Sequence, residues 1–535
     1  MFHENLLLII SLLFAVSMLV MLGQKLKISY PIFLVIGGLL ISLIPGIPLI
    51  QMDPDMILTL FLPPLLYEAA WYTSWRQFWK WKRPIILLAF GLVFFTSTII
   101  AYLTSSMIPG FTLALGFLLG GIISPPDAVA ATSVLKGVKI PKRLVTILEG
   151  ESLINDAASL IVFRVALVAV ISGQFSLGKT VGDFFIVGSM GIVIGLAIAH
   201  ILYVIHRFFP TTSNIDTALT LMSPYVMFIV AEHFHFSGVM AVVSGGLFLS
   251  YRSHELLSFS SRIQTTNVWS TIIFILNGIV FILIGLELPT IIDGLDDSSL
   301  EKGIQYGLII SLITIAIRFI WVFPIAHIPR FLSKKIRETE PSPGWKGPLI
   351  TSWAGMRGVV SLAAALSIPL TIDGAPFPHR NLILLVTFIV ILVTLVIQGL
   401  SLPLIIKLIK IEEIDDLVPE EEQTANIKLR LMRASLHHID TNFKSEIEEN
   451  ELVLNLRKRL ANSVDLTSER LESLECQTME FQEVHTYKKV YLDLINVQRK
   501  ELNKIRKEKV FELEVIQKQQ MELDFDESKL SQNAH

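Results

Sequence analysis

The feature that most constrains this chain is a series of long apolar segments between residues 4 and 409. A helix that crosses the hydrocarbon core of a membrane needs about 20 mainly apolar residues, and fewer where it is broken or shielded by protein. We place thirteen segments, at 4–22, 30–49, 56–72, 84–105, 112–135, 144–171, 183–205, 217–234, 238–250, 266–287, 303–324, 348–370 and 382–409. The ninth of these, 238–250, is short, so a count of twelve is the main alternative.

Charge distribution supports this count and orients the segments. Only 17% of the residues are charged, which excludes a soluble globular protein and a nucleic-acid-binding protein. Alternate loops carry 18 basic residues in one set and three in the other, namely Lys179, Lys302 and Arg380. Because basic loops stay in the cytoplasm, we expect the N-terminus outside and the C-terminus inside. The first segment has no basic n-region, so we read it as a retained span of a multi-pass plasma-membrane protein, with short loops that favour a bacterial origin.

Residues 411–535 have a different character from residues 1–410. They hold 18 basic and 27 acidic residues, and long stretches such as Leu452–Leu474 and Val484–Leu523 lack Gly and Pro. This pattern predicts a cytoplasmic helical bundle or coiled coil that regulates the membrane domain or supports a dimer. The alternative is a solvated extension without a specific ligand. The single cysteine, Cys476, lies in this tail and excludes an intrachain disulfide.

The fifth segment contains Pro125 and Pro126 directly before Asp127. Two prolines remove two amide donors and break a helix, and broken backbone at membrane depth survives only beside protein or a water-filled cavity. Carbonyl oxygens next to a carboxylate suit a hard cation. Asp127 is therefore a candidate cation ligand, and it is equally able to cap the half-helix that follows.

The sixth segment carries Ser152, Asn155, Asp156 and Ser159 on one helical face. A carboxylate surrounded by hydroxyl and amide oxygens binds a small cation, and protonation of that carboxylate releases it. We therefore predict that Asp156 holds either Na⁺ or a proton, with Ser152 and Asn155 beside it and Asp127 as a second Na⁺ ligand. Hydrogen bonding between helices by small polar residues is the structural alternative.

Buried arginines require buried partners, because a guanidinium stays charged. Arg318 lies well inside the eleventh segment, and Glu151 is the partner we favour because that pairing leaves Asp156 free to titrate. For Arg164 in the sixth segment we suggest Glu68, which follows a Pro-Pro break in the third.

Arg357 lies between Gly355 and Gly358 in the twelfth segment, a second place for a helix to break. We expect it to offset the partial negative charge at the C-terminal end of a broken helix. Interrupted segments in both halves are typical of inverted-repeat transporters with a midplane site. At the outer end of the eighth segment lie Glu232, His233 and His235. Histidine is the usual pH-sensing side chain, but here we favour a passive position at the membrane interface over a pH-sensing role.

No zinc-protease, Walker A or nucleophile-elbow motif occurs, so we expect neither an enzyme nor a cofactor. The strings Ser124-Pro-Pro-Asp127, Glu149-Gly-Glu-Ser-Leu-Ile-Asn155-Asp156 and Gly355-Met-Arg357-Gly358 closely resemble the monovalent cation:proton antiporter family 1, of the NhaP and sodium–proton exchanger type. The resemblance runs over nearly all of residues 4–410. It implies an all-α polytopic protein of about thirteen spans in two inverted six-helix repeats, with broken helices that cross.

The resemblance also implies a lipid-embedded homodimer with a dimerisation domain and a moving core domain, and elevator-like exchange of Na⁺, or Li⁺, for H⁺. Asp156 matches the family's ion- and proton-binding aspartate, Asn155 matches a mark of electroneutral exchange, and Ser152 matches a hydroxyl near the ion. Glu151 and Arg318 resemble the family's buried salt bridge. Pro126 departs from relatives that carry Thr there, which removes one hydroxyl from the ion shell. The alternative functions are K⁺/H⁺ exchange, a cation channel and a receptor that acts through the tail. A regulator that binds the tail is a further candidate partner.

Overall fold

The computed structural model describes residues 2–26, 29–44, 54–135, 140–173, 177–293, 295, 297–339, 342–372, 374–411, 420–475, 481–508 and 513–531. It divides into two compact units, Met1–Asp415 and Asp416–His535, close to the change in composition at residue 411. Cys476 and residues 412–419, which include four acidic residues, lie outside the described residues.

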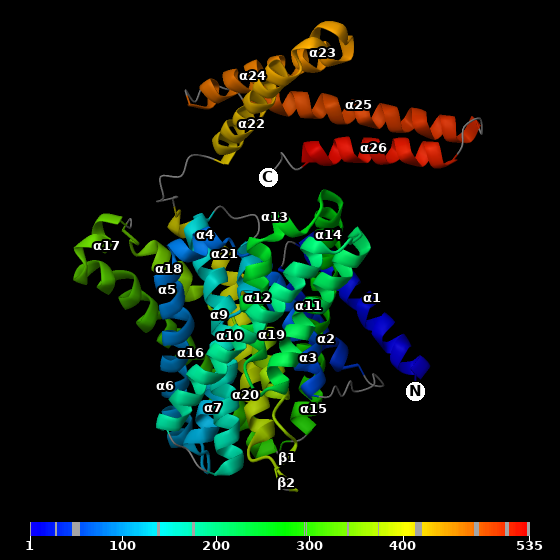
Figure 1. Ribbon diagram of the computed structural model, residues 1–535. Helices are drawn as coiled ribbons and strands as arrows, with labels where there is room; N and C mark the ends of the chain where they lie inside the picture. The colour runs from blue at the N-terminus through cyan, green and yellow to red at the C-terminus, as the bar shows by residue number, and fades with distance from the viewer. Residues whose placement is uncertain are drawn as a thin grey trace. The chain divides into compact units, whose positions relative to one another are not determined.

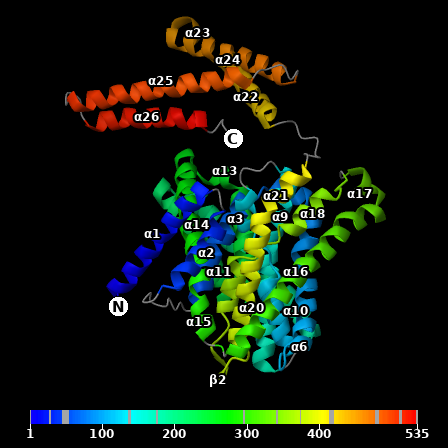
Figure 2. The ribbon, with the colours of Figure 1, turned by 180° about the vertical axis from the view of Figure 1, so that it is seen from behind.

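The first unit consists almost entirely of helices that run roughly parallel, with α16 at one flank and α1 at the opposite flank (Figures 1 and 2). Eight of the described helices are long and apolar enough to cross a membrane, and three shorter apolar helices accompany them. Large apolar side chains such as Phe14, Phe185 and Leu312 are exposed on this unit, as expected of a surface that faces hydrocarbon. The unit is therefore a membrane domain, and the full count of thirteen spans stays a prediction.

The helices of the membrane unit pack as two groups, with dense contacts inside each group and sparse contacts between them. We call the group that contains the broken helices the crossing bundle. Its members are α5 (Lys82–Ile86), η1 (Leu87–Leu92), α6 (Val93–Met107), α7 (Leu113–Ile123), α8 (Ala128–Leu135), α9 (Lys142–Ser172), α16 (Asp297–Leu332), α18 (Lys346–Trp353), α19 (Val359–Leu366), α20 (Arg380–Val393), η2 (Thr394–Gln398) and α21 (Gly399–Ile409).

The second group is called the flanking bundle. Its members are α1 (Phe2–Leu26), α2 (Tyr30–Ser42), α3 (Pro54–Tyr72), α10 (Leu177–Phe208), α11 (Ser213–His233), α12 (Gly238–Tyr251) and α14 (Phe259–Leu286). Short helices complete the unit: α4 (Trp75–Lys80), α13 (Ser253–Leu256), α15 (Leu288–Asp293) and α17 (Lys334–Thr339).

Both interruptions expected from the sequence are present. The fifth segment is divided into α7 and α8 around Pro125 and Pro126, and the twelfth into α18 and α19 around residues 354–358. The strictly helical prediction missed one small element, an antiparallel hairpin of β1 (Thr371–Ile372) and β2 (Ala375–Pro376). Gly374 occupies its turn with φ +83°, a conformation that glycine adopts without a steric cost.

The second unit is helical, as its composition indicates. Leu452–Leu474 lies within one helix, whereas Val484–Leu523 is shared between two helices that lie side by side (Figure 1). Ile495 and Ile516 are buried in this second unit. Its helices are α22 (Glu420–Asn442), α23 (Lys444–Glu449), α24 (Glu451–Glu475), α25 (Phe481–Glu508) and α26 (Leu513–Ser531).

Candidate cation-binding site

The two interrupted segments meet at their breaks. The backbone N–H of Asp127 donates to the carbonyl of Met356 at 2.7 Å, and Arg357 Nε donates to the carbonyl of Ile123 at 2.8 Å. Each break therefore satisfies polar backbone groups of the other, which is the condition for irregular backbone at membrane depth. Four helix ends, with their partial charges, converge on this point.

Arg357 lies at the centre of this junction and is 2% exposed. Its guanidinium donates to the carbonyls of Ile123 and Gly355, at the C-terminal ends of α7 and α18, and its backbone N–H donates to Thr394 Oγ1 at 3.1 Å. The positive charge thus lies against two carbonyl-rich helix ends, where it offsets their partial negative charge. Thr394 begins the π-helical turn η2, a partner that gave no signal in the sequence.

One carboxylate oxygen of Asp127 caps a helix, and the other is available to bind a cation. Oδ1 accepts from the N–H groups of Val129 at 2.8 Å and Ala130 at 3.3 Å, which caps α8. Oδ2 is buried and has no hydrogen-bond partner among the described residues. A Cβ on Gly358 would overlap this carboxylate, so the second break approaches it closely only because residue 358 is glycine. The capping and cation-site readings of Asp127 are therefore compatible in one side chain.

A cavity of about 350 Å³ lies beside the junction, between α3, α8, α9, α14 and α19. Four carboxylates line it, from Glu68, Asp127, Glu149 and Asp156, together with the Ser152 hydroxyl, and among the described residues no Lys, Arg or His lines it. This excess of carboxylates makes the cavity suitable for a cation. Along α9 the lining runs from Asp156 back toward Glu149, and so toward the basic loops.

Asp156 and Asn155 are adjacent in sequence but differ in environment. Asp156 is 8% exposed and lines the cavity, whereas Asn155 is fully buried and is not among the lining residues. The two side chains differ by about 100° around the helix, because an α-helix has 3.6 residues per turn. Neither amide atom of Asn155 has a hydrogen-bond partner among the described residues. The Ser159 hydroxyl donates to the Asp156 carbonyl at 2.9 Å and is therefore engaged locally.

Glu151 and Arg318 form a two-pronged ion pair inside the crossing bundle. Arg318 donates to the two carboxylate oxygens at 2.6 and 2.8 Å, and both side chains are 1% exposed. Arg318 Nε also donates to the Thr351 carbonyl at 3.1 Å. This geometry neutralises Glu151 by pairing, so the charge of Glu151 is separated from the carboxylates that line the cavity.

The suggested pairing of Arg164 with Glu68 is wrong. Arg164 pairs with Glu232 at 2.5 Å, and Glu68 lines the cation-suited cavity instead. The sequence places Glu68 at membrane depth, but which partner a buried charge meets depends on helix packing between distant segments.

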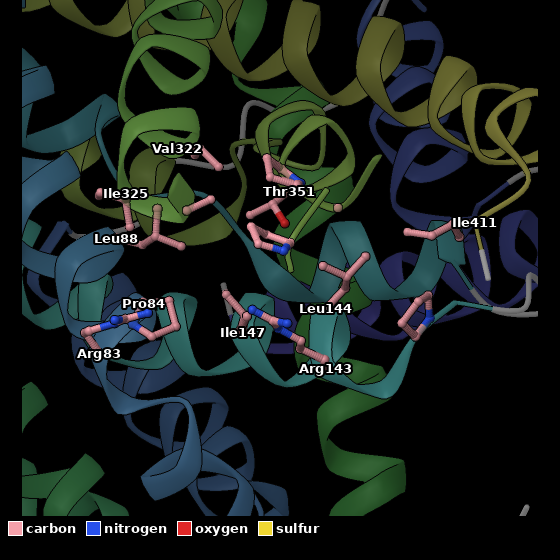
Figure 3. Close-up of a pocket in the computed structure, with 15 residues that line it drawn as sticks. Arg83, Pro84, Leu88, Arg143, Leu144, Ile147, Val322, Ile325, Thr351 and Ile411 are labelled. Carbon is pink, nitrogen blue, oxygen red and sulfur yellow. The ribbon is translucent and has the colours of Figure 1, made fainter. Parts of the chain in front are cut away.

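A second cavity, of about 70 Å³, lies at the N-terminal end of α9 (Figure 3). Arg83 and Arg143 lie on one side of it, opposite Val322, Ile325 and Thr351. Its other lining is largely apolar, and none of the described residues that line it carries a carboxylate. The arginine charges oppose the entry of a cation, so this cavity is unsuited to be the cation site.

Comparisons with known proteins agree with this geometry. Residues 9–408 match the model of the family described as sodium/hydrogen exchanger, transmembrane. The chain is 34% identical to the sodium, potassium, lithium and rubidium/H⁺ antiporter of Bacillus subtilis, over 71% of this chain and 58% of that protein. It is 32% identical to the Na⁺/H⁺ antiporter ApNhaP of Aphanothece halophytica, over 76% of this chain and 74% of that protein.

Among solved structures, the sodium proton antiporter MjNhaP1 from Methanocaldococcus jannaschii aligns with a TM-score of 0.60 and 19% identity. The alignment covers 74% of this chain and 99% of that one, so the two share a fold. With a family model that spans the membrane unit and relatives above 30% identity, the chain belongs to the sodium/hydrogen exchanger family of membrane transporters and is not an enzyme.

Proposed function

We propose that this protein is a secondary-active antiporter that exports cytoplasmic Na⁺ in exchange for external H⁺. The observation that carries this proposal is the cavity beside the crossed breaks, in which Asp156 and Asp127 present carboxylates and no basic side chain of the described residues lines the wall. Oxygen ligands of this kind suit small hard cations. The names of the relatives and the family model point to the same class of activity.

Exchange follows from competition at one group. A carboxylate at Asp156 binds a cation when ionised and loses it when protonated, so one site carries either Na⁺ or H⁺. The Asp127 Oδ2 oxygen and the Ser152 hydroxyl are the further ligands that we assign to the ion. The loaded site has the same charge with either ion, which makes one-for-one exchange electroneutral. In this scheme Glu151 is paired with Arg318 and does not bind the transported ion.

Access alternates when the crossing bundle shifts against the flanking bundle. The sparse contacts between the two bundles, compared with those inside each, support rigid-body movement of this kind. We further propose thirteen spans in two inverted repeats, an N-terminus outside, a cytoplasmic tail, and a homodimer in the plasma membrane of a bacterium. The positive-inside distribution of loop charge and the match to the NhaP fold support this arrangement.

K⁺/H⁺ exchange is the second candidate, because the relative from Bacillus subtilis is named for potassium as well as sodium. The test is exchange in proteoliposomes that contain a pH-sensitive dye, with Na⁺, Li⁺ and K⁺ added in turn. We expect Na⁺ to drive proton movement, and we expect a voltage clamp by K⁺ and valinomycin to leave that response unchanged. A response to K⁺ alone would mean that the substrate is K⁺ and not Na⁺. No response to any cation, in vesicles shown to contain folded protein, would overturn antiport.

A further inference from the structure

Among the described residues, the ion pair of Arg164 with Glu232 connects the two bundles of the membrane unit directly. Arg164 lies on α9 of the crossing bundle, and its guanidinium donates to Glu232 Oε2 at 2.5 Å. Glu232 lies in the last turn of α11, in the flanking bundle. The Arg318–Glu151 and His206–Asp216 pairs, by contrast, each join helices of a single bundle. Any shift of one bundle against the other must therefore strain or break the Arg164–Glu232 pair.

The Glu232 carboxylate is held in place by its own turn. Oε1 accepts from the backbone N–H of Gly238 at 2.9 Å, at the start of α12, while Oε2 meets Arg164. A Cβ on Gly238 would meet both Phe228 and Glu232 Oε1, so the turn is this tight only with glycine at position 238. The carboxylate is thus fixed by the flanking bundle and directed at a cation of the crossing bundle.

The position of the pair along α9 relates it to the cavity. Arg164 follows Asp156 by eight residues, about 12 Å along the helix axis, whereas the cavity lining extends the other way to Glu149. None of the residues of α9 beyond Asp156 lines that cavity. Leu160, one turn beyond Asp156, is buried. The cavity therefore lies on one side of Asp156, and a closed, ion-paired contact between the bundles lies on the other.

We propose that Arg164 and Glu232 form a latch that closes the external route to Asp156 and so stabilises the state that is open to the cytoplasm. The latch rests on the proposed function, because alternating access is what requires the bundles to separate there. Its side chains are 39% and 25% exposed, so water reaches the pair and it opens at a modest cost. The fully buried Arg318–Glu151 pair lacks this property and acts as a permanent support within its bundle.

The test measures external access to the route and does not depend on transport. In a Cys476→Ser background, Leu160→Cys places a thiol between Asp156 and the latch. A membrane-impermeant maleimide is added to the outside of intact cells or right-side-out vesicles, and the labelling rate is measured. Glu232→Gln keeps an oxygen for the Gly238 N–H but removes the charge. We expect about fivefold faster labelling, equivalent to about 1 kcal/mol at 1.4 kcal/mol per tenfold change.

Two further variants make the result specific. Arg164→Gln should raise the rate as much as Glu232→Gln, and the double variant should add little, because both remove the same interaction. The matched control is Glu255→Gln, which removes a carboxylate from the Arg252–Glu255 pair in the α12–α13 connection. We expect the control to leave the rate unchanged.

The outcomes separate the latch from the proposed function. Unchanged labelling in both latch variants would overturn the latch even where the parent protein exchanges Na⁺ normally. Equal acceleration in the Glu255→Gln control would also overturn it, since that result indicates general loosening. Absence of exchange by the parent protein with every cation would overturn the antiporter proposal, while the labelling rates would still decide whether the pair controls external access.

Discussion

Replacing Arg318 with alanine would leave the Glu151 carboxylate charged inside the crossing bundle without its partner. Both side chains are 1% exposed and are joined by two hydrogen bonds of 2.6 and 2.8 Å. Removing one member of such a buried pair costs about 3–5 kcal/mol, because the remaining charge is desolvated without compensation. We expect the apparent melting temperature in detergent to fall by roughly 5–15 °C. Glu151→Gln should also lower the melting temperature, because Arg318 then lacks a countercharge.

The assay is thermal unfolding of purified protein followed by size-exclusion chromatography or by intrinsic tryptophan fluorescence. Replacing both members with methionine should restore much of the lost stability, because an apolar pair of similar volume avoids the desolvation penalty. Arg252→Ala is the control, since Arg252 and its partner Glu255 are partly exposed at 42% and 31%, and we expect no measurable change there. Melting temperatures of Arg318→Ala and Glu151→Gln equal to that of the control would refute the assignment of this pair as a structural support.

Three further predictions concern transport. Asp156→Asn should abolish Na⁺-driven proton movement in proteoliposomes while leaving expression and melting temperature near those of the parent; retained exchange would contradict the role of Asp156. Gly358→Ala should reduce exchange strongly, because the added Cβ overlaps the Asp127 carboxylate, and transport equal to the parent would mean that Asp127 has no constrained position. Deleting residues 420–535 should leave measurable exchange, because the membrane unit is compact without the tail, and complete loss in folded protein would favour a function that resides in the tail.

The interrupted helices were predictable because their causes are local. Pro125 and Pro126 lack the amide donors that a helix needs, and charged residues at membrane depth stand out against an apolar background. The pairing of Glu151 with Arg318 was also predictable, because a buried guanidinium requires a carboxylate and the choice of Glu151 leaves Asp156 free to titrate. The same reasoning did not predict the partner of Arg164. Glu68 and Glu232 satisfy the same rule of charge, and only the packing of α9 against the α11–α12 turn selects Glu232.

The residues of the cavity wall illustrate a second limit. A helical projection groups Ser152, Asn155 and Asp156 on one face, yet the cavity includes Ser152 and Asp156 and leaves Asn155 out. This face is about 100° wide, and the neighbouring helices cover one part of it and leave the other part open to the cavity. The contact of Thr394 could not be predicted either, because it also depends on helix packing. Its hydroxyl accepts a hydrogen bond from the backbone N–H of Arg357, which lies 37 positions earlier in the sequence.

The amino-acid sequence alone indicates that this chain is a membrane protein with a charged tail. It also indicates where the helices break and which carboxylates lie at membrane depth. Those properties follow from hydrophobicity, proline chemistry and the cost of burying charge, all of which act locally. The packing of the helices is needed to see that the two breaks contact each other, that Glu68 faces the cavity, and that Arg164 and Glu232 join the two bundles. Each of these depends on how helices distant in sequence are rotated and packed, which no local rule specifies.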